Sequence, residues 1–465
     1  MVWSTSWLFH AIVTASLAIG TACSQPSGHE AITRDVCIIG GGASGTYAAV
    51  RLQDLGFSVT LIEQDDSLGG MVNTYTDPDG DIPIDYGVAD YRSNISVVES
   101  FLKRLDIAYG PSESTEGTTV RANLDTGQRV LNYTSPNALD ALTRYGEVAA
   151  KYSELEHGYY LPEPVPEDLL MPFGQFIEKY NVSGVIHVVY RSYGDILHQP
   201  TLYVMKYFGA NAIYNLFNGF IGTKSQNNSE IYDKAARVLS GNVMLHSHVV
   251  STNMTADGDG LIEIRVQSPL GLEIIRARKL VITIPPLISN LDGFDLGNSE
   301  KTLFGQFQSV GYYTSLVQNT GLPANTAVLN TNSNNLYDLP TLPSVYQIVP
   351  TKGTGLYQVE YGSPSPQPIE SVKSDILASI RRLKTTGIAN VTEDGEPQFV
   401  AFASHTPFQL TVPADAIKSG FYSKLYALQG QKQTFYTGAA FHAYDSSLLW
   451  RFTEDLLPKI SSGLN

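Results

Sequence analysis

The stretch CIIGGGASGTYAAVRLQDLGFSVTLIEQ, residues 37–64, decides the fold. It begins within a short apolar run, residues 36–39, that predicts a buried strand. Apolar residues then recur at spacings of three and four, which predicts a helix that ends at Gly56. A second apolar run, residues 58–62, predicts another strand and is followed by Glu63. Strand, helix and strand within about 30 residues predict a βαβ unit and therefore an α/β fold.

The turn between the first strand and the helix has the pattern G-x-G-x-x-G, formed by Gly40, Gly42 and Gly45. We expect Gly40 to allow a tight turn, Gly42 to leave room for a pyrophosphate, and Gly45 to let helix and strand pack closely. The helix then begins at Ala43 and Ser44, where free N–H groups can face phosphates. Glu63 can accept hydrogen bonds from ribose hydroxyls, which disfavours NADP. The pattern predicts a dinucleotide site and leaves NAD and FAD open.

Composition limits the classes of protein to consider. The chain has 465 residues, of which 43% are hydrophobic, so it can form a large core and two or three domains. Its net charge is −15 and it has no basic run, so we expect no nucleic-acid partner. No group of His, Cys, Asp and Glu has the spacing of a metal site. A second G-x-G-x-x-G is missing, which disfavours a separate NAD(P)H domain.

The first residues, MVWSTSWLFHAIVTASLAIGTACSQPSG, predict a secretory signal peptide over residues 1–23. An uncleaved anchor is the alternative, but the apolar part is short for a membrane span, so we expect no stable span. Six N-x-S/T sequons support N-glycosylation, at Asn94, Asn132, Asn181, Asn227, Asn253 and Asn390. Together they predict a glycoprotein of the secretory pathway, in the ER lumen, in a vesicle or outside the cell.

The rest of the chain alternates between two kinds of segment. After the βαβ unit, Gly69 and Gly70 offer a second place where backbone can approach a ligand. Residues 96–234 are mainly helical in pattern, and strands return in NVMLHSHVV, LIEIRVQS, RKLVITIPP and later runs. The tail QTFYTGAAF predicts a strand that ends at Gly438, before a helix. We therefore predict a nucleotide-binding domain at 33–91, 235–290 and 405–465, and a substrate-binding domain at 92–234 and 291–404.

In this order the segments resemble the flavin-containing amine oxidase superfamily. The glycine pattern, Glu63 and the run Gly69, Gly70, Met71 match its N-terminal FAD pattern, and Asp85-x-Gly87 follows at about the same spacing. Val249, in NVMLHSHVV, resembles the valine whose backbone contacts the nucleotide. LVITIPP resembles the crossover to the substrate domain, and Gly438 lies in the strand that approaches the flavin. The resemblance implies a Rossmann-type FAD-binding domain with an inserted sheet-and-helix substrate domain.

The run VCIIGGGASGTYAAVRLQDLG followed by GGMVNTYTDPDG resembles, more closely, the beta-cyclopiazonate dehydrogenase family of fungal flavoproteins. This resemblance implies dehydrogenation or oxidative cyclisation of a hydrophobic secondary metabolite, of terpenoid-pyrone or indole-alkaloid type. Hydride would pass to FAD, and molecular oxygen would accept the electrons. The alternatives are a secreted flavin amine oxidase acting on a small amine and a flavin-binding protein without turnover. The oligomeric state stays open.

Two departures from the superfamily pattern bear on the chemistry. Met71 stands where the superfamily has Arg, and the strand VGYYTSLVQ carries Tyr312 and Tyr313 where a lysine often lies near the flavin. Both departures disfavour a typical amine oxidase site. The tail also lacks the cysteine that would bond to the cofactor, so we expect non-covalent FAD.

The segment FHAYDSS, which follows the predicted flavin strand, supplies the candidate catalytic residues. We expect His442 to act as a proton acceptor and Tyr444 to form a wall of the pocket. Packing roles explain both residues equally well. His405, in ASHTPF, is a weaker candidate of the same kind.

Overall fold

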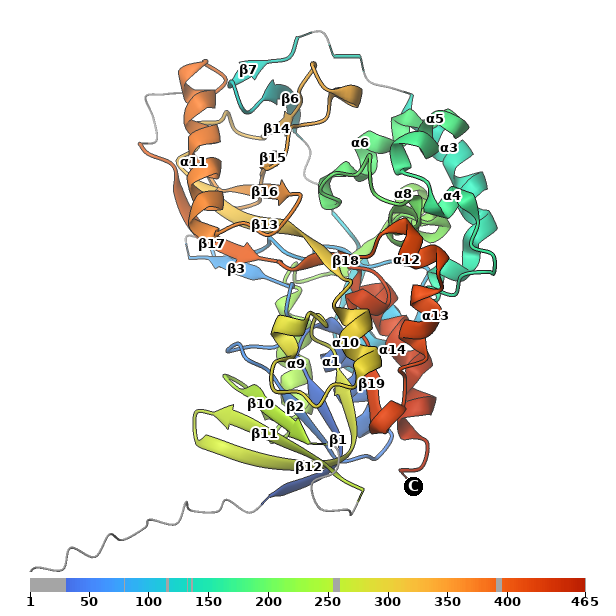
Figure 1. Cartoon of the computed structure of the whole chain (residues 1–465). Coiled ribbons are helices and arrows are strands. Elements are labelled where there is room, and N and C mark those ends of the chain that lie inside the picture. The colour runs from blue at the N-terminus through green and yellow to red at the C-terminus, as the bar shows by residue number, and fades with distance from the viewer. Residues whose placement is uncertain are drawn as a thin grey trace, which may run out of the picture.

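The computed structural model describes residues 31–464 except 79, 114–116, 132, 135–136, 254–259 and 390–394. The predicted signal peptide and the sequons at Asn132 and Asn390 lie outside these residues. Within them, no helix is both long and apolar enough to cross a membrane. Two separate sheets organise the chain, one at the bottom of Figure 1 and the other at its top left, with a group of helices at the top right.

The first sheet has the strand order β10-β11-β12-β1-β2-β9, and β19 also pairs with β12. Its strands are β1 (Ile32–Ile39), β2 (Val59–Ile62), β9 (Val243–Met244), β10 (His248–Asn253), β11 (Ile262–Ser268), β12 (Gly271–Ile282) and β19 (Thr434–Tyr436). β1 pairs in parallel with both β2 and β12. The inner residues of β1 and β2 are buried on both faces of the sheet, which explains their continuous apolar runs.

Four helices pack on this sheet or on each other beside it: α1 (Ala43–Asp54), α2 (Ser96–Arg104), α9 (Ser229–Val238) and α14 (Ser446–Ser461). An aromatic cluster joins α1, α2 and α14. The Trp450 ring of α14 stacks on Tyr47 of α1 at 6.2 Å and meets the edge of Phe101 of α2 at 4.9 Å. The C-terminal helix therefore closes the core that the N-terminal βαβ unit begins (Figure 1).

The second sheet has the order β17-β13-β16-β15-β14-β6-β7, with β18 paired to β13. Its strands are β6 (Thr118–Asn123), β7 (Gln128–Arg129), β13 (Gln308–Gln318), β14 (Thr326–Asn330), β15 (Ser344–Pro350), β16 (Tyr357–Ser363), β17 (Gln398–Ser404) and β18 (Phe408–Thr411). The long helix α11 (Ile369–Thr385) packs on it, and its apolar side shares a core with β13, β15 and β16.

A helical group lies beside the second sheet. It comprises α3 (Ala138–Ala149), α4 (Glu167–Leu170), α5 (Phe173–Tyr180), α6 (Ile186–Val189), α7 (Thr201–Tyr207), α8 (Ala210–Asn218), α12 (Ala414–Lys418) and α13 (Phe421–Tyr426). Aromatic rings fill its core, as in the Tyr159–Tyr422 stack at 3.7 Å. Helix α10 (Asn298–Phe304) joins this group to the first sheet through α13.

Two local predictions are wrong in detail. The run NVMLHSHVV forms two strands, β9 and β10, because His246 at φ 50° turns the chain between them. The region 96–234 also contains strands, since β6 pairs with the distant β14. Within the same region, β5 (Tyr109–Pro111) pairs with β8 (Ile221–Thr223), and upstream of it β3 (Thr74–Asp77) pairs with β4 (Ile82–Asp85). The β6–β14 and β5–β8 pairings depend on distant partners, which a local apolar pattern does not show.

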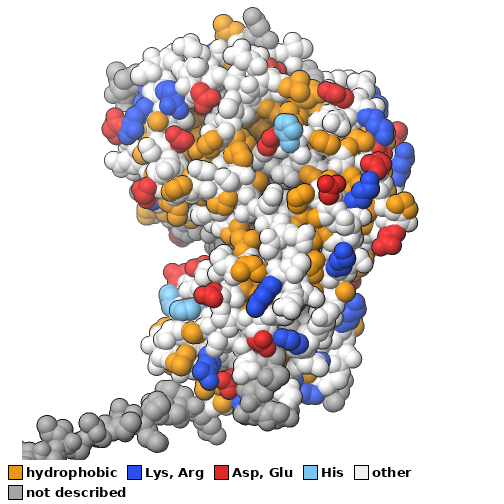
Figure 2. Space-filling view, in the orientation of Figure 1, with side chains coloured by type: hydrophobic (Ala, Val, Ile, Leu, Met, Phe, Trp, Pro, Cys, Tyr) orange, Lys and Arg blue, Asp and Glu red, His pale blue; other side chains and the backbone are white. Residues whose placement is uncertain are grey.

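The charged surface agrees with the composition. On the face shown in Figure 2, acidic and basic side chains are interspersed, with apolar side chains between them.

Candidate active site

A cavity of about 1050 Å³ lies between the two sheets. One wall comes from the carboxyl ends of β1, β2 and β12, the loop that contains Gly69 and Gly70, and the turn after β19. The opposite wall comes from β13, from the β17–β18 connection and from α7. Ligands in α/β folds commonly bind at the carboxyl ends of parallel strands, so this cavity is the candidate active site.

The glycine turn has the tight geometry that the sequence predicts. Gly40 has φ +100°, and a Cβ atom there would lie 2.7 Å from Thr283 Oγ1. A Cβ atom on Gly45 would lie only 1.8 Å from the carbonyl oxygen of Gly40. Gly45 is buried within α1 and does not line the cavity. Its place is consistent with the close packing of helix and strand rather than with ligand contact.

Gly42 differs from its neighbours because it has open space. The nearest atom that a Cβ would meet is Gly70 Cα, at 3.9 Å. Gly69 donates its backbone N–H to Gly41 O at 2.9 Å, which holds the two glycine segments together. Gly42, Gly69 and Gly70 all line the cavity. A side chain at Gly42 would project where a ligand can lie.

The start of α1 has an unsatisfied polar group. Ser44 lies in the first turn, lines the cavity together with Ala43, and is 4% exposed. Its Oγ has no hydrogen-bond partner in the described part of the chain. A buried hydroxyl without a partner is costly, and a phosphate oxygen would accept its hydrogen. The site therefore fits the diphosphate of a dinucleotide such as FAD.

Glu63 lies where the sequence places it, at the end of β2 on the cavity wall. Its Oε2 accepts the Gly41 N–H at 2.5 Å and its Oε1 accepts the Asp65 N–H at 2.9 Å. Each carboxylate oxygen can accept a further bond, so a ribose can still be held. Met71, Val249 and Gly438 line the same cavity.

Gly438 allows the chain to approach β12 closely. It has φ +107°, and a Cβ there would lie 2.8 Å from Thr283 O. The cavity thus brings together the predicted cofactor residues from five segments of the chain, with Gly45 behind them.

Aromatic side chains form the opposite wall. Tyr312 stacks on Phe408 with ring centroids 4.9 Å apart, and Phe408 lies 4.3 Å from Tyr444. The Tyr444 hydroxyl donates to Pro407 O at 3.2 Å. All three rings line the cavity, so Tyr444 lies where the sequence predicts a pocket wall. This wall can hold a flat apolar molecule against the glycine side.

His405 also lines this wall, and burial lowers its pKa to about 4. Its Nε2 lies 2.9 Å from Asn73 Oδ1 and donates to that acceptor. The imidazole is therefore neutral at physiological pH and is a weak base there. We assign it to shaping the pocket.

The shifted pKa of His405 predicts an acid-sensitive fold. The unfolded chain, with its ordinary pKa of 6.5, binds more protons than the folded chain between pH 6.5 and 4. The contribution of neutral His405 to the free energy of unfolding is therefore fully present above pH 6.5. It is lost as the pH falls towards 4, by up to about 3 kcal/mol. His405→Gln keeps a donor towards Asn73 and should lose less stability over this range in urea unfolding. Equal pH dependence in both proteins would contradict this assignment.

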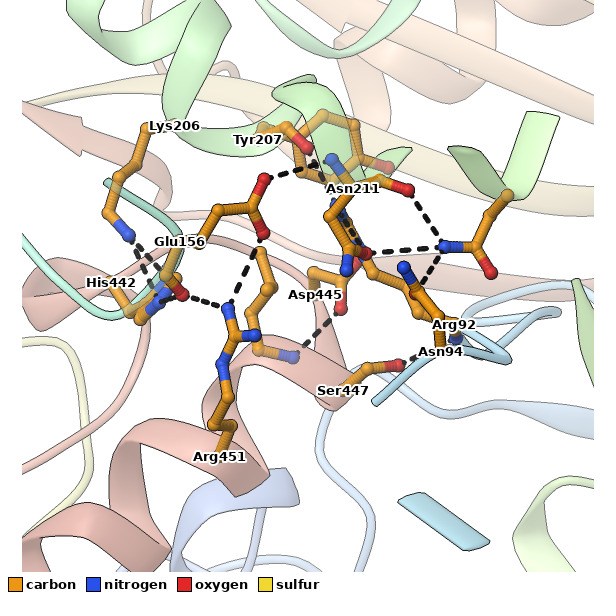
Figure 3. Close-up of polar contacts among 12 residues, drawn as sticks. Arg92, Asn94, Glu156, Lys206, Tyr207, Asn211, His442, Asp445, Ser447 and Arg451 are labelled. Carbon is orange, nitrogen blue, oxygen red and sulfur yellow. Dashed lines mark hydrogen bonds and ion pairs between the residues drawn. The ribbon is translucent and has the colours of Figure 1, made fainter. Parts of the chain in front are cut away.

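His442 does not line the large cavity. It is fully buried, and its Nδ1 lies 2.8 Å from the Nζ of Lys206, a residue of α7 (Figure 3). Its Nε2 lies 3.0 Å from the backbone oxygen of Glu156. Burial and the neighbouring Lys206 charge hold the pKa of His442 well below its ordinary value. Its predicted role as proton acceptor stays a prediction, and the geometry favours a supporting position behind the cavity wall.

A polar network extends from His442 to the first turn of α14 (Figure 3). Glu156 accepts from the Asn211 N–H at 3.0 Å and is paired with Arg451. On the same side, Arg92 donates to Asp445 at 2.8 Å and to Tyr207 O at 2.7 Å. Asp445 lines the cavity and caps α14 by accepting the Leu448 N–H.

Sequence reasoning did not find Lys206 or Arg92. Lys206 is a single charged residue in the apolar run LYVMKYF, and Arg92 directly follows the buried Tyr91. A lone charge within an apolar helix is the signal that could have marked Lys206, because such a charge needs buried partners.

Known proteins resemble this chain over most of its length. Residues 38–105 match the model of an NAD(P)-binding Rossmann-like domain. The FAD-dependent oxidoreductase oblC of Cochliobolus heterostrophus is 40% identical, over 94% of this chain and 92% of its own. Beta-cyclopiazonate dehydrogenase of Aspergillus flavus is 33% identical, over 96% of this chain and 97% of its own.

Solved structures share the fold at lower identity. A fatty acid isomerase from P. acnes superposes with a TM-score of 0.72 at 18% identity, over 92% of this chain and 98% of its own. Putrescine oxidase superposes with a TM-score of 0.64 at 16% identity, over 93% of this chain and 99% of its own. The predicted fold class is thereby confirmed: a Rossmann-type unit combined with an inserted sheet-and-helix part, as in flavin amine oxidases.

Proposed function

Because the chain belongs to the family of fungal FAD-dependent oxidoreductases that includes beta-cyclopiazonate dehydrogenase, we propose that it oxidises a hydrophobic secondary metabolite. The reaction is a dehydrogenation or an oxidative ring closure on a terpenoid-pyrone or indole-alkaloid scaffold. One observation carries this proposal. The glycine wall and the aromatic wall of Tyr312, Phe408 and Tyr444 face a single cavity.

The cofactor site is proposed to hold FAD without a covalent bond. The diphosphate would lie against Gly40, Gly42, Ala43 and the Ser44 hydroxyl, with the ribose at Glu63. Gly69, Gly70, Met71, Val249 and Gly438 would complete the contacts. Cys37, the cysteine within the described residues, is buried in β1, and burial raises the pKa of its thiol to about 12. Such a thiol does not favour attachment to a cofactor.

The residues of the chain position the substrate and exclude water. Bound FAD would supply the acceptor for a hydride from a substrate C–H bond, with molecular oxygen as the final electron acceptor. Tyr312 and Phe408 offer flat apolar area, and Tyr444 is fixed by its bond to Pro407 O. An apolar scaffold held on these rings displaces water from the cavity, which strengthens electrostatic effects on the reacting atoms.

We also propose that the protein travels through the secretory pathway and carries N-linked glycans. The sequon residues Asn94, Asn181 and Asn253 are exposed. Their accessibility supports glycosylation at these positions.

Anaerobic titration of the purified holoenzyme tests the proposed reaction. Hydrophobic indole alkaloids and terpenoid pyrones should bleach the visible flavin absorption and yield a product two hydrogen atoms lighter. A panel of small amines, putrescine among them, serves as the contrast. Bleaching by the amines, followed by release of peroxide when air is readmitted, would instead indicate an amine oxidase. Bleaching by neither class would indicate a flavin-binding protein without turnover.

A further inference from the structure

The aromatic wall of the cavity contains a cation. Arg191 lies in a short 3-10 helix, Tyr190–Ser192, and is the one Arg or Lys among the described residues that line the cavity. A partly buried arginine in a wall with no other Arg or Lys among its described residues costs free energy unless a partner compensates its charge. The contacts of Arg191 therefore indicate what the cavity is built to bind.

Within the described chain, Arg191 makes one side-chain hydrogen bond, from Nη1 to Gln347 Oε1. No ion pair joins it to an acid in that part of the chain. A guanidinium has five N–H donors, so most of its hydrogen-bonding capacity is left for a ligand. Arginine is also well suited to bind two oxygens of one planar acid.

The second sheet fixes the orientation of Arg191. Gln347 of β15 donates from Nε2 to Glu360 Oε1 at 2.7 Å, and the two residues are paired across β15 and β16. Burial lowers the pKa of Arg191, but the charge of Glu360 raises it, and the net shift is upward. Arg191 is thus a fixed cation held from the sheet opposite the glycine turn. Its position favours contact with the substrate rather than with the diphosphate.

Two phenols lie near this cation. Tyr207 and Tyr312 line the cavity, and neither hydroxyl has a hydrogen-bond partner in the described part of the chain. Burial raises the pKa of both phenols, whereas the charge of nearby Arg191 lowers it. Both keep their proton at neutral pH and can donate it. Arg191 and the two hydroxyls form a set of free donors at the substrate side of the cavity.

We infer that Arg191 is a specificity residue that binds an acidic oxygen of the substrate, a carboxylate or an enolate, with Tyr207 and Tyr312 as neighbouring donors. This inference rests on the proposed function and narrows its substrate class to hydrophobic acids. The same charge opposes a protonated amine in the cavity.

Binding of matched acid and ester pairs tests this inference. The probes are 4-phenylbutanoate, indole-3-butyrate and 1-pyrenebutyrate with their methyl esters, titrated into the oxidised holoenzyme by calorimetry. The acids should bind at least about 10-fold more tightly than the esters, as expected for charge-assisted hydrogen bonds. Arg191→Met should lose about 10-fold to 100-fold in acid affinity with little change for the esters. Arg191→Lys should keep part of the preference.

Arg265→Met is the matched control, because Arg265 lies exposed on β11, away from the cavity. It should bind acids and esters as the unchanged protein does. Equal binding of acids and esters to the unchanged protein, absence of acid binding across the series, or an acid preference that survives Arg191→Met would each overturn the inference. Flavin content is measured on the same samples. A protein without flavin would overturn the proposed function instead, whatever its acid preference.

Discussion

Gly42→Val should give a folded protein that purifies without flavin. A Cβ at Gly42 meets no described protein atom closer than 3.9 Å, so the first added carbon fits without a clash within the fold. Its methyl groups would instead occupy the cavity beside Gly70 and Ser44, where the diphosphate is proposed to lie. Gly42 is the N-cap of α1 at φ −69° and ψ −170°, a conformation open to valine, so the cost to stability should be about 1 kcal/mol.

The ratio of visible flavin absorbance to protein absorbance measures this effect, with circular dichroism as the test of folding. Gly110→Val, in β5, is a suitable control. A Cβ at Gly110 would meet only the flexible Lys224 side chain, at 3.5 Å. The control should keep its flavin. Full flavin content in folded Gly42→Val would show that the diphosphate does not lie at this turn.

Arg92→Met should lower the free energy of unfolding by about 3–5 kcal/mol. The Arg92 side chain is 3% exposed and pairs with Asp445 at 2.8 Å. It also donates to Asn211 Oδ1 and to Tyr207 O (Figure 3). Its removal leaves Asp445, on the wall of the cavity, as a largely buried charge without its cation. Buried acceptors that lose a charged donor are strongly destabilising.

Arg104→Met provides the comparison. Arg104 pairs with Asp54 at 2.6 Å, but its side chain is 41% exposed. Exposed ion pairs contribute at most about 1 kcal/mol, so this variant should unfold close to the unchanged protein in urea. If both variants lost similar free energy of unfolding, the buried network around Arg92 would contribute no more to stability than an exposed ion pair.

Local sequence was sufficient for the βαβ unit. The turn at Gly40, the contact of Gly45 with Gly40 and the position of Glu63 all depend on residues within about 30 positions of each other. Their spacing is fixed by the geometry of one strand, one turn and one helix. The confirmed fold class followed from this unit and from the family resemblance of the later segments.

The catalytic side was less predictable because it depends on distant partners. His442 follows Gly438 closely, so an extended tail would place it near the cofactor. A 3-10 turn, Ala439–Phe441, ends that extension. The His442 imidazole then lies in the core, in contact with Lys206 of α7. Arg191 takes its orientation from Gln347, 156 residues away. Periodicity also could not separate the aromatic rings that line the cavity from those that fill the helical core.

The visible absorption spectrum of the purified chain, recorded before and after denaturation, tests the central claim most directly. We expect a two-band flavin spectrum from the folded protein. After denaturation and removal of the protein, the yellow colour should stay in the soluble fraction, as non-covalent FAD. A folded but colourless protein, or a flavin that stays attached to the denatured chain, would contradict the proposed cofactor site.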